Sequence, residues 1–233
     1  MYDQNTITSS AATRERSLLR NVYIWMTMGL ALTGIVAYGV ANNEVIWNMI
    51  YSNLTTFFVI CIVQLALVFI LSSRIMKMSV SVATICFAGY AALTGLTLSV
   101  ILLVYTAESI ASTFFITAGT FAGMSFYALT TKRDLSSIGS YLIMGLWGLI
   151  IASVVNMFLR SSGLYWLISF AGVAIFVGLT VYDTQVIKRW NQEYGASADE
   201  SLFVRLSILG ALRLYLDFIN LFLYLLRILG RRR

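Results

Sequence analysis

The chain has 233 residues, of which 59% are hydrophobic and only 11% are charged, and its formal net charge at pH 7 is +6. Soluble domains carry about 25% charged residues, so this composition excludes an ordinary soluble protein. The chain contains no histidine and no proline. Without histidine it cannot form a histidine-ligated metal site, a Ser-His catalytic pair or a histidine proton relay, and any helix break must come from Gly or Ser.

Seven apolar segments follow one another along the chain. We expect them at residues 21–41, 53–73, 79–105, 109–131, 136–159, 163–187 and 202–229. Each is long enough to cross a bilayer, which takes about 20 apolar residues of helix. None shows the alternation of polar and apolar residues that a membrane β-barrel requires. We therefore predict an all-α polytopic membrane protein, a bundle of seven transmembrane helices.

The polar parts of the chain are short. Residues 1–20 are polar and include three arginines, which predicts a cytoplasmic tail rather than a cleaved signal peptide. The transmembrane domain then occupies residues 21–229, and a basic tail occupies residues 230–233. The longest internal loop, "KRWNQEYGASADES" at 188–201, is polar and mixed in charge, so we expect it to be solvated.

Lys and Arg residues alternate between the loops, and this alternation predicts the orientation of the chain. The loops after the first and third segments have none, and the loop after the fifth has Arg160 alone. The loops after the second, fourth and sixth segments carry pairs: Arg74 and Lys77, Lys132 and Arg133, and Lys188 and Arg189. The N-terminus is therefore expected in the cytoplasm. Seven crossings would place the basic tail "RILGRRR" outside, against the same rule, and the sequence leaves its side open.

Small residues and cysteines lie inside the apolar segments. Gly119 and Gly123 have the GxxxG spacing that lets membrane helices approach closely, and "GLWG" at 145–148 adds two more glycines. We expect these glycines to pack within the bundle and to carry no chemistry. Cys61 and Cys86 lie in different segments and are expected to be free thiols.

The last segment carries a polar stripe on an otherwise apolar helix. Arg213, Asp217, Asn220 and Tyr224 follow one another at spacings of four, three and four residues, which places them on one helix face. A charge at the bilayer centre costs about 3 kcal/mol, so this face must meet protein or water. The alternative is that Arg213 and Asp217 form an ion pair that only neutralises itself.

A second carboxylate, Asp183, lies in "GLTVYDTQVIKRW" at the end of the sixth segment, next to Tyr182. It is either a helix-end aspartate that faces water or Lys188, or part of a polar cluster. If Asp183 meets Asp217, the two cannot both ionise without repulsion and would share a proton. Loss of that proton would create repulsion or a site for a hard cation such as Ca²⁺. Arg74 or Arg213 could swing onto the free carboxylate and act as a latch.

Three stretches of the chain resemble the Bax inhibitor-1 family, also called the transmembrane Bax inhibitor motif family. They are "LLRNVYIWMTMGLALTGIVAYG" at 18–39, "VYDTQVIK" at 181–188 and "ALRLYLDFINLFLYLLRILG" at 211–230. The short loops resemble a bacterial inner-membrane member. The resemblance implies seven helices with the last one central, a pH-sensitive Ca²⁺ leak and, in eukaryotes, suppression of cell death.

The resemblance also implies roles for individual residues. It assigns the pH sensor to Asp183 and Asp217, which would also contact the permeant Ca²⁺ transiently. It also assigns the latch to Arg74, or Lys77. From their polarity and position alone, Tyr182, Asn220 and Tyr224 are expected to support the pair. A small or neutral residue is expected where Arg213 stands, so Arg213 could hold Asp217 and weaken the switch.

Two other classes of membrane protein fit the sequence less well than a leak channel, and two further functions fit it equally well. An intramembrane aspartyl protease requires GxGD and a proline motif, and a retinal protein requires a mid-span lysine; the chain has neither. We expect no enzymatic activity and no cofactor other than permeant Ca²⁺. The partners expected are the lipid bilayer, calcium ions or protons, and other membrane proteins, but no nucleic acid. A non-transporting regulator that binds membrane proteins or proteases, and a proton-coupled carrier, remain alternatives to the leak channel.

Overall fold

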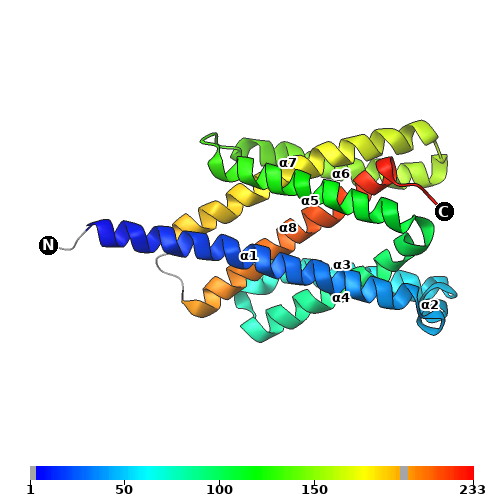
Figure 1. Ribbon diagram of the computed structural model, residues 1–233, viewed down its shortest axis with the longest axis horizontal. Coiled ribbons are helices and arrows are strands. Elements are labelled where there is room, and N and C mark those ends of the chain that lie inside the picture. The colour runs from blue at the N-terminus through cyan, green and yellow to red at the C-terminus, as the bar shows by residue number, and fades with distance from the viewer. Residues whose placement is uncertain (1–3, 195–198) are drawn as a thin grey trace. The chain divides into compact units, whose positions relative to one another are not determined.

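The computed structural model describes residues 4–194 and 199–233, and within these ranges it contains helices and no β-strand. The elements are α1 (Gln4–Ala41), α2 (Glu44–Tyr51), α3 (Leu54–Arg74), the short 3₁₀ helix η1 (Ile75–Lys77), α4 (Val80–Val104), α5 (Ala107–Thr130), α6 (Ser136–Leu159), α7 (Ser162–Tyr194) and α8 (Glu200–Leu229), as Figure 1 shows.

Seven of these helices are long and apolar enough to cross a membrane. They correspond one to one with the seven predicted segments, so the predicted all-α polytopic membrane fold is confirmed. α8 is the most buried of them: 72% of its most apolar window lies inside the protein, against 6–39% for the other six. This burial agrees with a central last helix.

Three boundaries differ from the prediction. α1 already begins at Gln4, inside the expected tail. α2 was missed because it has only eight residues; the side chain of Asn43 caps it by accepting hydrogen bonds from the backbone of Val45 and Ile46. α7 continues to Tyr194, so the first half of the expected solvated loop is helical. The sequence contains no glycine or proline between Lys188 and Tyr194 that would stop the helix.

The chain divides into two compact units, and α7 and α8 each contribute to both. The first unit comprises the chain up to Val104 together with residues 188–215, and the second comprises residues 105–187 and 216–233. Asp183 and Asp217 both belong to the second unit. Arg74 and Arg213 both belong to the first.

Polar side chains connect helices inside the first unit. The Tyr215 hydroxyl lies 2.6 Å from that of Thr33, which also donates to the carbonyls of Gly29 and Ala91. α1 approaches α4 closely at Gly95, where a Cβ atom would lie 2.6 Å from the Thr33 carbonyl oxygen. Since water is absent from the hydrocarbon core, these bonds satisfy groups that would otherwise be costly there.

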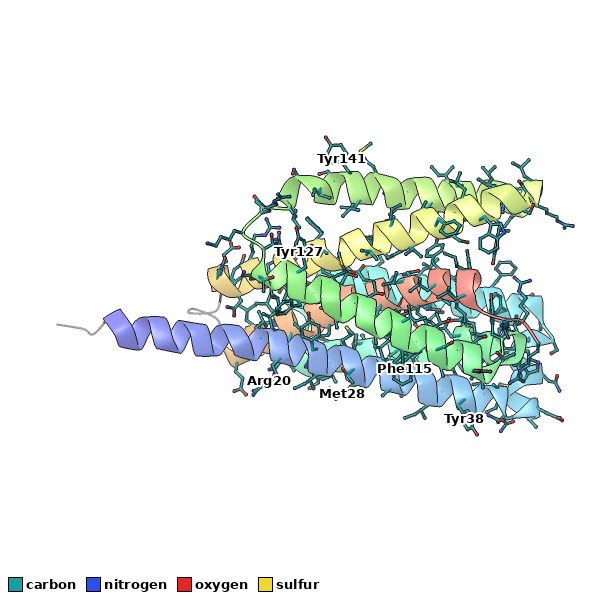
Figure 2. The ribbon with its side chains drawn as sticks, turned by 45° about the horizontal axis from the view of Figure 1, so that its top comes forward. Arg20, Met28, Tyr38, Phe115, Tyr127 and Tyr141 are labelled. Carbon is teal, nitrogen blue, oxygen red and sulfur yellow. The ribbon has the colours of Figure 1, made fainter. Side chains whose placement is uncertain are left out.

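In the second unit α6, α7 and α8 pack through apolar side chains. Phe176, Leu179 and Leu221 form a buried cluster that Leu142 and Leu146 of α6 extend. The other faces of the helices of this unit carry large apolar residues that are exposed. Figure 2 shows Tyr141 of α6 projecting outward, and both Tyr141 and Phe115 of α5 are 73% exposed. Such residues are suited to contact lipid.

The expected packing of the glycines is wrong for three of the four. No neighbouring heavy atom lies within 4 Å of the position that a Cβ would take at Gly119, Gly123 or Gly148, whereas Gly145 meets Ile175 at 3.0 Å. Spacing along a helix places glycines on one face but does not determine which face packs. Cys61 and Cys86 are free, as predicted, and half-buried.

Candidate functional site

Asp183 and Asp217 are both buried in membrane-spanning helices. Asp183 on α7 is 8% exposed, and Asp217 on α8 is 4% exposed. Water on the membrane surface is therefore not the main environment of Asp183, which disfavours the interpretation of it as a solvated helix-end aspartate. A buried carboxylate in a membrane span is a candidate functional residue, because its ionised form is costly there.

The contacts between α7 and α8 define the register of the two aspartates. Phe176 of α7 stacks on Tyr224 of α8 with ring centroids 5.8 Å apart. Three residues forward on α7 and three residues back on α8, Leu179 and Leu221 share the same buried cluster. The two helices therefore run antiparallel. Asp183 lies one turn after Leu179 on α7, and Asp217 lies one turn before Leu221 on α8. Because the helices are antiparallel, this register places the two aspartates at the same level on facing sides.

Residues adjacent to Asp183 fix its segment within the second unit. The ring of Tyr182 packs directly against Gly139 of α6, where no Cβ atom could be accommodated. The side chain of Gln185 donates to the carbonyl of Arg133 over 3.0 Å and accepts from the backbone N–H of Leu135 over 3.2 Å. Gln185 thus holds the loop between α5 and α6 against α7. Sequence reasoning missed this role, because a glutamine near a helix end is ordinary.

The other members of the α8 stripe contact different partners. Tyr224 packs against Phe176, and Asn220 donates to the carbonyl of Leu216 on its own helix over 2.8 Å. The Arg213 guanidinium lies over the ring of Trp190, 5.2 Å from its centroid. Arg213 is half-buried, and this cation–π contact holds its guanidinium. Trp190 is thus a partner of Arg213 in addition to Asp217, the intrahelical partner that the sequence suggested.

Comparisons with known proteins show the family of the chain. A family model described as "Inhibitor of apoptosis-promoting Bax1" matches residues 15–233. The chain belongs to the Bax inhibitor-1 family. It is 51% identical over 218 residues to the inner membrane protein YbhL of Escherichia coli strain K12, a match that covers 94% of this chain and 93% of the relative.

Two further relatives extend this similarity within bacteria. A protein of Borreliella burgdorferi is 50% identical over 219 residues, covering 94% of each chain. The protein RP147 of Rickettsia prowazekii is 43% identical over 232 residues, covering 98% of this chain and 96% of its own length. The resemblance seen in three stretches of sequence thus holds over nearly the whole chain.

In this Bax inhibitor-1 family member, Arg74 is exposed and ends α3, in the first unit. The latch role of Arg74 or Lys77 stays a prediction. Arg205, near the start of the last segment, donates to the carbonyls of Met76 and Met78 over 2.9 and 3.2 Å. It thereby ties the start of α8 to the end of η1.

Within the described residues no group of three or more His, Cys, Asp or Glu side chains could hold a metal ion. Two carboxylates at one level can contact a cation in passing but fall short of the six to eight oxygen ligands of a stable Ca²⁺ site. The arrangement is therefore suited to transient contact with a cation and to exchange of a proton.

The C-terminal tail contacts the loop between α4 and α5. The backbone N–H of Thr106 donates to the carbonyl of Arg231 over 3.1 Å, and the N–H of Arg231 donates to the Ser109 hydroxyl over 3.0 Å. The tail thus lies at the start of α5, and Lys132 and Arg133 follow the other end of that helix. Within the second unit the tail therefore lies at the end of α5 opposite to this Lys/Arg pair.

Proposed function

We propose that this protein is a pH-sensitive leak for Ca²⁺ or a similar cation in the bacterial inner membrane, with Asp183 and Asp217 as its gate. The observation that supports the proposal is the burial of two carboxylates in adjacent membrane helices, at one level of the α7–α8 register. Membership of the Bax inhibitor-1 family and the similarity to an inner membrane protein support the setting.

The chemistry of the gate follows from the repulsion between like charges. Two adjacent carboxylates in a low dielectric cannot both ionise without a large cost, so at low pH they hold a shared proton. A shared proton joins α7 and α8 by a hydrogen bond and favours the closed state. When the proton leaves, repulsion between the carboxylates favours separation of the helices, and a divalent cation can take the place of the proton.

Arg213 is the candidate modulator of this gate. It stands one helical turn from Asp217, and its guanidinium is held over Trp190. A fixed positive charge one turn away favours the ionised form of Asp217. In this proposal Arg213 shifts opening to lower pH, and Arg74 is the candidate latch that the family resemblance implies.

Flux through liposomes tests the proposal. The purified protein is reconstituted around a Ca²⁺-sensitive dye, and flux is measured between pH 5 and pH 8 for the wild type, Asp183→Asn and Asp217→Asn. The wild-type flux is expected to rise with pH, and both variants are expected to lose this dependence. Glu193→Gln removes an exposed carboxylate of α7 and is the matched control, expected to behave as the wild type.

Two outcomes contradict parts of the proposal. Flux equal to that of empty liposomes at every pH would exclude the leak and leave the non-transporting regulator. Flux that both Asn variants leave unchanged would keep the leak and exclude the sensor. A pH dye on the inside distinguishes a proton-coupled carrier, since only a carrier moves protons in a fixed ratio to the cation.

A further inference from the structure

Five exposed arginines gather at the end of the second unit that holds the C-terminus. They are Arg160, Arg227, Arg231, Arg232 and Arg233. Arg160 lies in the loop between α6 and α7, and the others end α8 or follow it. At the same end, the first turn of α5 carries the acidic side chain of Glu108. The surplus of positive charge calls for an anionic partner.

The tail that carries these arginines is fixed to the protein. Besides the bonds of the Arg231 backbone to Thr106 and to the Ser109 hydroxyl, Arg232 forms an antiparallel bridge with Tyr105. Gly230 packs so closely on Tyr105 that a Cβ atom would lie 2.7 Å from the ring. The arginines are thus presented at defined positions, as a binding site requires, rather than on a loose tail.

Tyrosines support the guanidinium groups at this end. Arg227 lies over the rings of Tyr224 and Tyr165, at 5.2 and 5.9 Å from their centroids. Arg232 hydrogen-bonds to Tyr105, and this bond raises the pKa of the guanidinium further above its ordinary value, so it is charged at any physiological pH. Tyrosines typically mark the level of the lipid headgroups, the level at which a phosphate would meet these arginines.

An apolar groove of about 200 Å³ lies between α6 and α7, next to this end. Its lining is entirely apolar, and small residues create the space: Gly145, Gly148 and Ala152 on α6, and Ala171 on α7. Leu164 of the lining lies one turn after Arg160, which connects the two helices. The groove therefore begins just below a charged group and extends toward the middle of the membrane.

We propose that this end of the second unit binds an anionic phospholipid, with the phosphate on the arginines around Tyr165 and an acyl chain in the α6–α7 groove. Positive charge alone would accept any anion, but positive charge above an apolar groove in a membrane-spanning region matches a lipid. The proposal is independent of the cation leak and does not require any flux.

Lipid titration of the purified full-length protein in neutral detergent tests the proposal. Binding of phosphatidylglycerol is followed by native mass spectrometry, with phosphatidylcholine and inorganic phosphate as the other ligands. Phosphatidylglycerol is expected to bind at least tenfold more tightly than phosphatidylcholine. Since each arginine near a lipid surface contributes about 1 kcal/mol, each of Arg160→Gln, Arg227→Gln and Arg232→Gln should weaken binding about fivefold.

Matched controls separate the site from general attraction. Lys132→Gln with Arg133→Gln removes two exposed charges from the opposite end of α5 and should leave phosphatidylglycerol binding unchanged. Gly148→Leu fills the groove without changing charge and should weaken binding, whereas Gly119→Leu on an open face should not. Equal binding of the two lipids, equal losses in the control variant, or competition by inorganic phosphate with no effect of Gly148→Leu would each overturn the lipid site.

Discussion

The register of α7 and α8 can be tested at Gly172. Its missing side chain lets Tyr224 lie directly over the backbone of α7, so a Cβ atom there would stand 2.7 Å from three ring carbons. Non-bonded carbons prefer separations of about 3.5–4.0 Å. The ring cannot slide aside easily, because Phe176 stacks on it and the Arg227 guanidinium lies over it. Gly172→Ala should therefore force α7 and α8 apart.

The expected change in the free energy of unfolding of Gly172→Ala follows from two opposing effects. Overpacking a filled site costs about 1–3 kcal/mol, and alanine gains about 1 kcal/mol over glycine in a helix interior. The net loss is about 1 kcal/mol, which lowers the melting temperature of a chain of this length by about 2–4 °C. Gly119→Ala is the control: nothing surrounds it, so only the gain applies and its melting temperature should stay level or rise.

The assay is thermal unfolding of the purified variants in one detergent, followed by the loss of monodisperse protein. In a Tyr224→Ala background, Gly172→Ala should no longer lower the melting temperature, because the first change has removed the ring that clashes. If Gly172→Ala were as stable as Gly119→Ala, the ring would not be held over Gly172. The register that places Asp183 opposite Asp217 would then lose its first contact.

Two hydrogen-bonding side chains give the remaining predictions. Gln185→Leu removes both bonds to the backbone of Arg133 and Leu135, so protease cleavage in the α5–α6 loop should accelerate several-fold; a rate equal to the wild type would show that the glutamine does not hold the loop. Tyr215→Phe removes the hydroxyl bonded to Thr33 and should lower stability by about 1 kcal/mol, measured by thermal unfolding; an unchanged melting temperature would mean that Thr33 needs only its two carbonyl acceptors.

The membrane spans could be predicted because they depend on one strong physical signal. A helix in hydrocarbon needs about 20 predominantly apolar residues, and few other structures produce runs of that kind. The ends of the helices were harder to predict. Lys188 and Trp190, for example, are compatible with a loop but continue α7. α2 has too few residues for any periodicity to show.

The predicted site depended on a similar argument about cost. Asp217 was conspicuous because a charge inside an apolar segment is expensive, and its burial agrees with that reasoning. Gln185 and Arg205 were not conspicuous, because polar residues near helix ends are common and their partners lie far away in the chain. The expected packing was wrong at Gly119, Gly123 and Gly148 for another reason. Gly95 and Gly172, which belong to no such glycine pair, make closer contacts. Whether a glycine makes a close helix contact depends on the residue that faces it on the neighbouring helix, and its spacing from the next glycine does not show this.

The position of the tail within the second unit bears on the conflict between seven crossings and the arginines of "RILGRRR". Thr106 and Ser109 at the start of α5 hold Arg231, and the 24 residues of α5, about 36 Å of helix, separate them from Lys132. The tail therefore lies at the opposite end of α5 from this Lys/Arg pair. If α5 spans the bilayer as predicted, the orientation rule does not account for the tail. An anionic headgroup at that end would compensate the charge of the arginines, and the α6–α7 groove beneath Arg160 is where the rest of such a lipid fits.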